Sequence, residues 1–165
     1  MTATPLIILG RPAWAPEADD TWIRVASLNA ATAALPRQRT RVLLTVGRQS
    51  IGPFAAKPQH YYLIRVIDPP SIPEAMTDFE ILRDRGPFRV DAERALMIEK
   101  RIDILVTKNS GGTAAHAKIV AARQLGLPVI MADRPRHIEG QSVTSVDDVL
   151  ARLAEHHASL TKRSV

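Results

Sequence analysis

The sequence predicts an α/β protein in which helices flank an open parallel sheet. Short apolar runs end at glycine, proline or polar turns, and most of them are followed by segments with helical spacing. No segment repeats at a fixed period and none is low in complexity. Strands that alternate with helices form units in which the strands lie parallel and the helices cover the sheet. The 165 residues suffice for one domain, or for one domain and a fragment of another.

The predicted strands are apolar runs with a high density of strand-forming residues. The first run ends at the Gly-Arg-Pro of residues 10–12, the third ends at Gly47, and the fourth is closed by the Asp-Pro-Pro of residues 68–70. These residue types favour turns, so they limit each run to the length of a strand. The predicted strands span residues 5–9, 21–25, 41–46, 60–67, 79–82, 102–106 and 129–131.

The predicted helices follow most of these runs. Residues 28–35 are rich in alanine and stop at Pro36, because proline cannot continue a helix. Residues 91–100 start at Asp91, a residue type that caps helices, and carry apolar side chains at helical spacing. The predicted helices span residues 28–35, 51–56, 91–100, 113–125 and 146–158.

The composition excludes several classes of protein. The absence of cysteine excludes thiolate nucleophiles, disulfides and iron–sulfur ligation, and it favours a reducing compartment such as the cytoplasm. The hydrophobic fraction of 45% and the charged fraction of 24% are ordinary for globular domains. No apolar run approaches the roughly 18 residues that cross a bilayer, and the N-terminus does not resemble a signal peptide. We therefore expect a cytoplasmic protein that does not enter a membrane.

The charge distribution favours a small anionic ligand over nucleic acid. The 22 basic and 17 acidic residues leave a net charge of +5. The arginines are scattered among acidic residues, and aromatic residues make up only 4%, so no stacking platform for nucleic acid is present. A phosphorylated cofactor or a carboxylate-rich substrate suits this charge. The adjacent His156 and His157 have no third ligand at metal spacing, and we expect no metal site.

A glycine-bearing turn between a strand and a helix is the most informative motif. Parallel strands bind ligands at their carboxyl ends, where the start of a helix offers free N–H groups to an anion. Two adjacent glycines allow close backbone approach, and Lys118 can reach back toward the turn. The alternative is an ordinary capped loop, because the sequence fits neither standard nucleotide-binding fingerprint. The candidate cofactor-binding residues are Thr107, Lys108, Asn109, Ser110, Gly111, Gly112, Thr113 and Lys118.

Two other strand exits carry a basic residue. Gly47 and Arg48 follow the predicted strand 41–46, and Arg134 follows the predicted strand 129–131. The alternative at the first exit is a capped turn with an exposed arginine. Because the carboxyl ends of parallel strands meet at one edge of the sheet, these residues are predicted to line a cleft with the glycine turn and to bind substrate there.

Three segments resemble the precorrin-6A reductase family. The run VTKNSGGTAAHAKIVAARQLGLPVIMADRP at residues 106–135 resembles the C-terminal signature of that family. LGRPAW at residues 9–14, followed by Asp20 and Trp22, and then LLTVGR at residues 43–48 resemble its middle region, in the same order. The resemblance implies a Rossmann-like fold and an oxidoreductase that uses NADPH. That enzyme reduces one carbon–carbon double bond of the tetrapyrrole precorrin-6A to give precorrin-6B in cobalamin biosynthesis.

The sequence departs from that family at its beginning. Members carry an N-terminal Rossmann-like domain with a glycine-rich opening segment, and this segment is absent here. We therefore expect residues 1–36 to be the C-terminal remnant of that domain and residues 37–165 to form the C-terminal Rossmann-like domain. Val46 also differs, since the family tends to have threonine there. We expect the chain alone to reduce precorrin-6A poorly and to associate through its incomplete N-terminal region.

Two other functions fit the residues. The chain suits a non-catalytic module that binds a tetrapyrrole or a nucleotide without turnover. It also suits an unrelated α/β enzyme that uses the glycine turn for another phosphate ligand. The family reaction takes its hydride from the cofactor and requires no protein nucleophile, and no residue is assigned a catalytic role from the sequence.

Overall fold

The computed structural model describes residues 6–134 and 142–161. Its contacts group the chain into two units, one formed by Ala13–Arg134 and the other by Met1–Pro12 together with Pro135–Val165. Each unit is described by itself below. Within the described ranges, no helix has the length and apolar character that would let it cross a bilayer.

The larger unit is built on a six-stranded sheet in which every pair of neighbouring strands is parallel. The order of strands is β2-β7-β6-β3-β4-β5, so the chain runs outward from β3 in one direction and from β6 in the other. This confirms the predicted fold class. The strands are β2 (Trp22–Val25), β3 (Arg41–Thr45), β4 (Tyr61–Val66), β5 (Phe79–Arg83), β6 (Ile104–Lys108) and β7 (Val129–Ala132).

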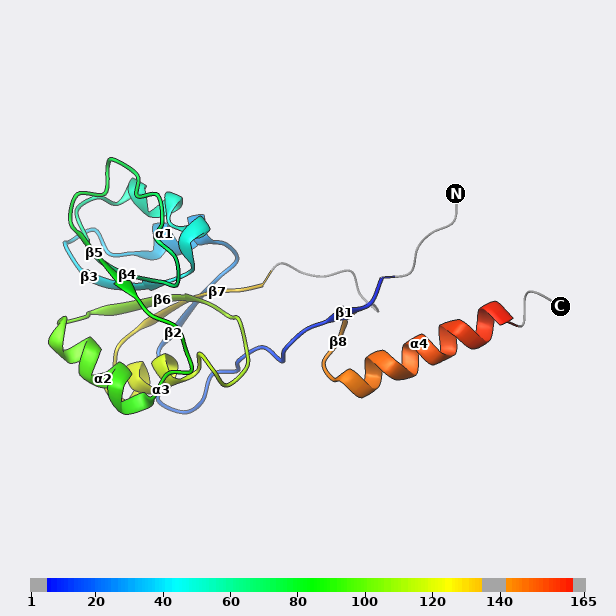
Figure 1. The fold of residues 1–165 in the computed structure, drawn as a ribbon. Coiled ribbons are helices and arrows are strands. Elements are labelled where there is room, and N and C mark those ends of the chain that lie inside the picture. The colour runs from blue at the N-terminus through cyan, green and yellow to red at the C-terminus, as the bar shows by residue number, and fades with distance from the viewer. Residues whose placement is uncertain (1–5, 135–141, 162–165) are drawn as a thin grey trace. The chain divides into compact units, whose positions relative to one another are not determined.

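Helices cover both faces of this sheet (Figure 1). One face packs against α1 (Leu28–Ala34) and the 3-10 helix η2 (Gly52–Ala56), and its core includes Leu44, Ile64 and Val106. The other face packs against α2 (Val90–Glu99) and α3 (Ala117–Gln124), and its core includes Leu43, Leu63 and Leu105. Neighbouring residues of a strand point to opposite faces, so β3, β4 and β6 each contribute to both cores.

Three predicted helices differ in detail from the structure. Within the predicted helix 51–56, Gly52–Ala56 form the 3-10 helix η2, in which a proline occupies one of the first two positions and limits regular hydrogen bonding. Helix α3 starts at Ala117 and not at residue 113, because the glycine turn continues through residues 113–116. Helix α2 starts at Val90, so Asp91 lies in its first turn and pairs with Arg89 instead of capping the helix. A short 3-10 helix, η1 (Arg48–Ser50), precedes η2.

The boundary between the units differs from the predicted boundary at residue 36. Strand β2 pairs with β7 over its whole length, from Trp22 opposite Val129 to Val25 opposite Ala132, and α1 packs beside it. The residues from Ala13 onward therefore belong to the larger unit. This pairing joins segments more than a hundred residues apart, which a local pattern does not reveal. That residues 1–36 derive from a second domain stays a prediction.

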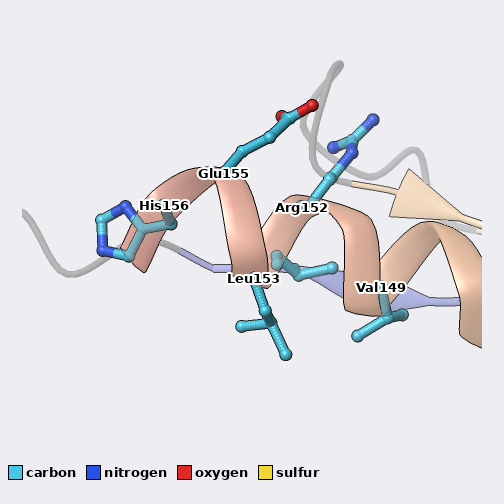
Figure 2. A pocket seen from close by; sticks show the side chains of 6 residues that line it. Val149, Arg152, Leu153, Glu155 and His156 are labelled. Atoms are coloured by element: carbon cyan, nitrogen blue, oxygen red, sulfur yellow. The ribbon is translucent and has the colours of Figure 1, made fainter. Parts of the chain in front are cut away.

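The smaller unit contains β1 (Ile8–Leu9), β8 (Ser142–Val143) and α4 (Val146–Thr161). Strands β1 and β8 are parallel, and Gly10 N donates a hydrogen bond to Val143 O at 2.8 Å. The sequence pattern predicts a longer first strand and does not predict β8. Val149 and Leu153 extend to one side of α4, whereas Arg152 and Glu155 extend to the opposite side (Figure 2).

Candidate functional site

A cavity of about 230 Å³ opens at the carboxyl ends of β3, β4 and β6. Strand order reverses between β3 and β6, and ligands of open α/β sheets bind in the crevice outside such a reversal. The cavity is therefore in the position that the fold class predicts for a binding site. The lining residues that matter most for its chemistry are Thr45, Gly47, Arg65, Phe88, Ser110 and Lys118.

Three elements bring two cations to this cavity. Arg65 lies on β4, where its neighbours Ile64 and Val66 point into one core, so the Arg65 side chain points to the opposite face with α2 and α3. Lys118 lies in the first turn of α3, and side chains there tilt toward the start of the helix. Glu93 of α2 lies beside Arg65 and forms an ion pair with it. A central strand and two helices thus fix these side chains.

These charged groups are almost completely removed from water. The side chains of Arg65 and Glu93 are 5% and 3% exposed, and Lys118 is 4% exposed. Burial lowers the pKa of Lys118 to about 8; the nearby charge of Arg65 also lowers this pKa, and Glu93 raises it. Arg65 stacks over Phe88, with its guanidinium carbon 4.1 Å from the ring centre. The cavity therefore presents concentrated positive charge to a ligand.

The glycine turn is held in place by Trp14. Trp14 N donates a hydrogen bond to Asn109 Oδ1 at 2.8 Å, and Asn109 Nδ2 donates to Trp14 O at 2.9 Å. Trp14 Nε1 donates to Gly112 O at 2.8 Å. The turn also needs its glycines, since Gly111 and Gly112 have φ angles of 64° and 76°. Asn109 is buried, so its side chain shapes the turn.

The structure brings together some of the residues predicted from the sequence. Gly47, Ser110 and Lys118 line the cavity described above. Gly47 also lines a neighbouring cavity of about 330 Å³, together with Arg48 and Lys108. Lys108 Nζ donates a hydrogen bond to Ser50 Oγ at 2.7 Å, across the exits of β6 and β3.

Hydrogen bonds at or beside the glycine turn involve three other predicted residues. Arg134 Nε donates a hydrogen bond to Asn109 O, so Arg134 supports the glycine turn from the exit of β7. Thr107 is buried, with Oγ1 donating to Lys108 O at 3.3 Å. Thr113 O accepts a hydrogen bond from His116 N at 3.1 Å. Arg48 and Arg134 both follow carboxyl ends of strands; Arg48 lines the second cavity, and Arg134 donates to the glycine turn.

Sequence reasoning missed Arg65, Glu93 and Trp14. Arg65 carried a readable signal, because it is the only charged residue in the apolar run of residues 60–67. A strand buried on both faces tolerates a charge only where that charge has a partner or a role. The contacts of Glu93 and Trp14 depend on the tertiary structure and have no local signal.

Comparison with known proteins decides the family. Residues 1–154 match the sequence profile of the family described as Precorrin-6x reductase CbiJ/CobK. The chain belongs to this family. It is 41% identical to the Precorrin-6A reductase of Rhodobacter capsulatus over 158 residues, which cover 96% of this chain and 63% of that relative. It is 46% identical to the Precorrin-6A reductase of Rhodococcus erythropolis, over 91% of this chain and 59% of that relative.

A solved structure of the family has the same fold. The chain matches a CobK precorrin-6A reductase with a TM-score of 0.85 and 41% sequence identity, over 92% of this chain and 62% of that one. These matches confirm the resemblance inferred from the three sequence motifs. The chain spans about three fifths of the length of the CbiJ/CobK relatives that it matches.

Proposed function

We propose that the chain provides one wall of an NADPH-dependent precorrin-6A reductase in the cytoplasm. The reaction transfers a hydride to one carbon–carbon double bond of precorrin-6A and yields precorrin-6B in cobalamin biosynthesis. Family membership supports the reaction class. The observation that carries the proposal for this chain is the cationic cavity at the carboxyl ends of β3, β4 and β6, because both cofactor and substrate are polyanions.

The glycine turn and Lys118 are proposed to hold an anionic part of the cofactor. The turn residues at positions 107–113 fit this role because Gly111 and Gly112 have no Cβ to block a phosphate, and Ser110 lines the cavity with Lys118. Asn109 contributes by fixing the turn against Trp14. When bound, the nicotinamide supplies the hydride, while the chain binds and orients it.

Gly47, Arg48 and Arg134 are proposed to hold the carboxylates of the tetrapyrrole. Arg48 is half exposed at the edge of the neighbouring cavity, with NH1 3.9 Å from Asp68 Oδ2, so its guanidinium stays accessible. Gly47 has a φ of 86° and leaves open space where a side chain would stand. Arginine suits carboxylates because its planar fork donates two parallel hydrogen bonds.

The cofactor assignment is tested by nucleotide binding. If Lys118 meets the additional 2′-phosphate of NADPH, Lys118→Ala lowers the affinity for NADPH roughly tenfold to a hundredfold, because one charge-assisted hydrogen bond is lost. The affinity for NADH falls much less. Calorimetric titration of both nucleotides measures this difference. Equal affinities of the variant and the parent for NADPH, with the fold intact by circular dichroism, contradict the assignment.

A binding module without turnover is the second candidate. The observation in its favour is the cationic cavity, which can bind an anionic ligand whether or not a reaction follows. Hydride transfer needs cofactor and substrate held with their reacting atoms about 3–3.5 Å apart, and a cleft between two domains needs both of its walls. Ligand binding without NADPH oxidation, in a chain extended by a family N-terminal domain, favours the module over the enzyme.

A further inference from the structure

Arg65 and Lys118 are two buried cations, and one buried carboxylate, Glu93, forms an ion pair with Arg65. We propose that they form a single oxyanion site, which takes one phosphate or one carboxylate group of the ligand, and that Glu93 positions Arg65 within it. The identity of that ligand rests on the proposed function, whereas the oxyanion site itself rests on the geometry of the cavity. Neither Arg65 nor Glu93 is among the residues that the sequence motifs assign to binding.

The hydrogen bonds of Arg65 are incomplete. Within residues 6–134 and 142–161, Arg65 NH1 donates to Glu93 Oε1, while Arg65 NH2 and Glu93 Oε2 have no hydrogen-bonding partner. Native proteins rarely leave a buried charged donor unmet, because it has lost its water and gained nothing in return. Arg65 is one of the residues that line the cavity. We infer that an oxygen of a ligand bound there supplies the acceptor that NH2 lacks.

The charges around the cavity also do not balance. Among the residues that the structure describes, Arg65, Arg85 and Lys118 line it against one carboxylate, Asp84, and Glu93 adds a second negative charge as the ion-pair partner of Arg65. One positive charge is left over, and two of the positive groups, Arg65 and Lys118, are buried. A bound oxyanion neutralises this excess, and the low polarity of the surroundings strengthens the attraction.

The aromatic rings beside Arg65 and Lys118 do not satisfy the hydrogen-bonding groups of these cations. Lys118 Nζ lies 5.2 Å from the centre of the Trp14 ring, and Arg65 stacks over Phe88. Ring faces attract positive charge but do not accept the N–H groups at the edge of a guanidinium. In the described part of the chain, the structure shows no ion pair for Lys118. The two rings therefore contact the cations without accepting hydrogen bonds from the edge N–H groups of the Arg65 guanidinium.

The test measures binding of two probes, one from each source of oxyanion. The first probe is 2′,5′-ADP, which carries phosphates, and the second is uroporphyrin, a tetrapyrrole with eight carboxylates. The variants are Lys118→Met and the double variant Arg65→Gln/Glu93→Gln, which removes the arginine without leaving a buried carboxylate unpaired. Arg39→Gln is the matched control, because Arg39 is exposed, precedes β3 and pairs with Asp78 away from the cavity.

Both cavity variants are expected to bind at least one probe with an affinity roughly tenfold to a hundredfold lower than that of the parent. The affinity of the control for the same probe is expected to change less than about twofold. The weakened probe identifies the source of the oxyanion. Unchanged affinity for both probes in both cavity variants overturns the proposal, and so does failure of the parent chain to bind either probe at millimolar concentration.

Thermal stability separates a binding role from a structural one. Without a ligand, Lys118→Met is expected to raise the melting temperature, because it removes a desolvated charge beside Arg65 and keeps the side-chain volume. Inorganic phosphate then raises the melting temperature of the parent more than that of the variant. A fall in the melting temperature of Lys118→Met, with an equal phosphate effect in both proteins, overturns the proposal. These measurements involve no hydride transfer, so they succeed or fail independently of the reductase reaction.

Discussion

Single residues of this protein show how burial changes the pKa of a titratable side chain. Lys118 is the clearest example, because the pKa of its ammonium group falls from an ordinary value of 10.5 to about 8. At pH values between these two, the unfolded chain binds more protons at this position than the folded chain does. The stability contributed by Lys118 therefore rises with pH across this interval.

Because the stability contributed by Lys118 rises with pH, the Lys118→Met variant gives a measurable prediction. Below about pH 8 the variant is expected to be more stable than the parent by about 1–3 kcal/mol, because both states of the parent carry the charge and only the folded state buries it. The difference shrinks as the pH rises toward 10. Urea unfolding at several pH values measures it, and the comparison cancels the titration of the buried tyrosines. A difference that does not change with pH contradicts the prediction.

His60 gives a second prediction, which concerns acidic pH. The ring is buried, its Nδ1 accepts a hydrogen bond from Thr40 N at 3.2 Å, and burial lowers the pKa of the imidazole below its ordinary 6.5, with the charge of Lys57 acting in the same direction. The stability contributed by neutral His60 is therefore fully present above pH 6.5 and is lost as the pH falls below it.

We expect the parent to lose on the order of 1 kcal/mol more than His60→Asn when the pH is lowered from about 7 to about 5. Asparagine retains an acceptor for Thr40 N and does not titrate, so the two proteins differ mainly in this proton. Denaturant unfolding at the two pH values supplies the comparison. Equal losses in the two proteins are inconsistent with a buried neutral His60.

At the scale of elements, the glycine turn shows a conformational requirement. Gly112 has a φ of 76°, which strains any side chain with a Cβ, so Gly112→Ala is expected to lower the free energy of unfolding by about 1–2 kcal/mol. Gly52→Ala is the control, because Gly52 has no positive φ and a Cβ there meets nothing within 4 Å. Chemical unfolding of both variants tests this. Similar losses in both would show that the turn does not depend on its glycine.

Sequence patterns predicted the strands and helices better than they predicted the contacts between segments that are far apart in the chain. The strands of the large sheet and the carboxyl-end position of Gly47, Ser110 and Lys118 follow from local periodicity and the rule for parallel sheets. The pairing of β2 with β7 and the contact of Trp14 with the glycine turn join distant segments. Arg65 is not among the predicted site residues, because it lies within a predicted strand and not at the exit of one.

At the scale of the whole molecule, the two units differ in how completely they bury apolar residues. The larger unit has a core on each face of its sheet. In the smaller unit, Leu6, Leu9 and Leu150 are more than half exposed. Exposed apolar side chains favour association, which supports the expectation that the chain associates through its N-terminal region. Light scattering on the purified chain tests this expectation, and a monomer at all concentrations contradicts it.

The most direct test of the account is NADPH oxidation in the presence of precorrin-6A. It compares this chain with the same chain extended by a family N-terminal domain. The extended chain is expected to turn over, and this chain alone is expected to show little or no turnover, because the reacting atoms are aligned only when both walls of the cleft are present. Equal turnover by the two contradicts the need for a second wall, and no turnover by the extended chain contradicts the reductase assignment.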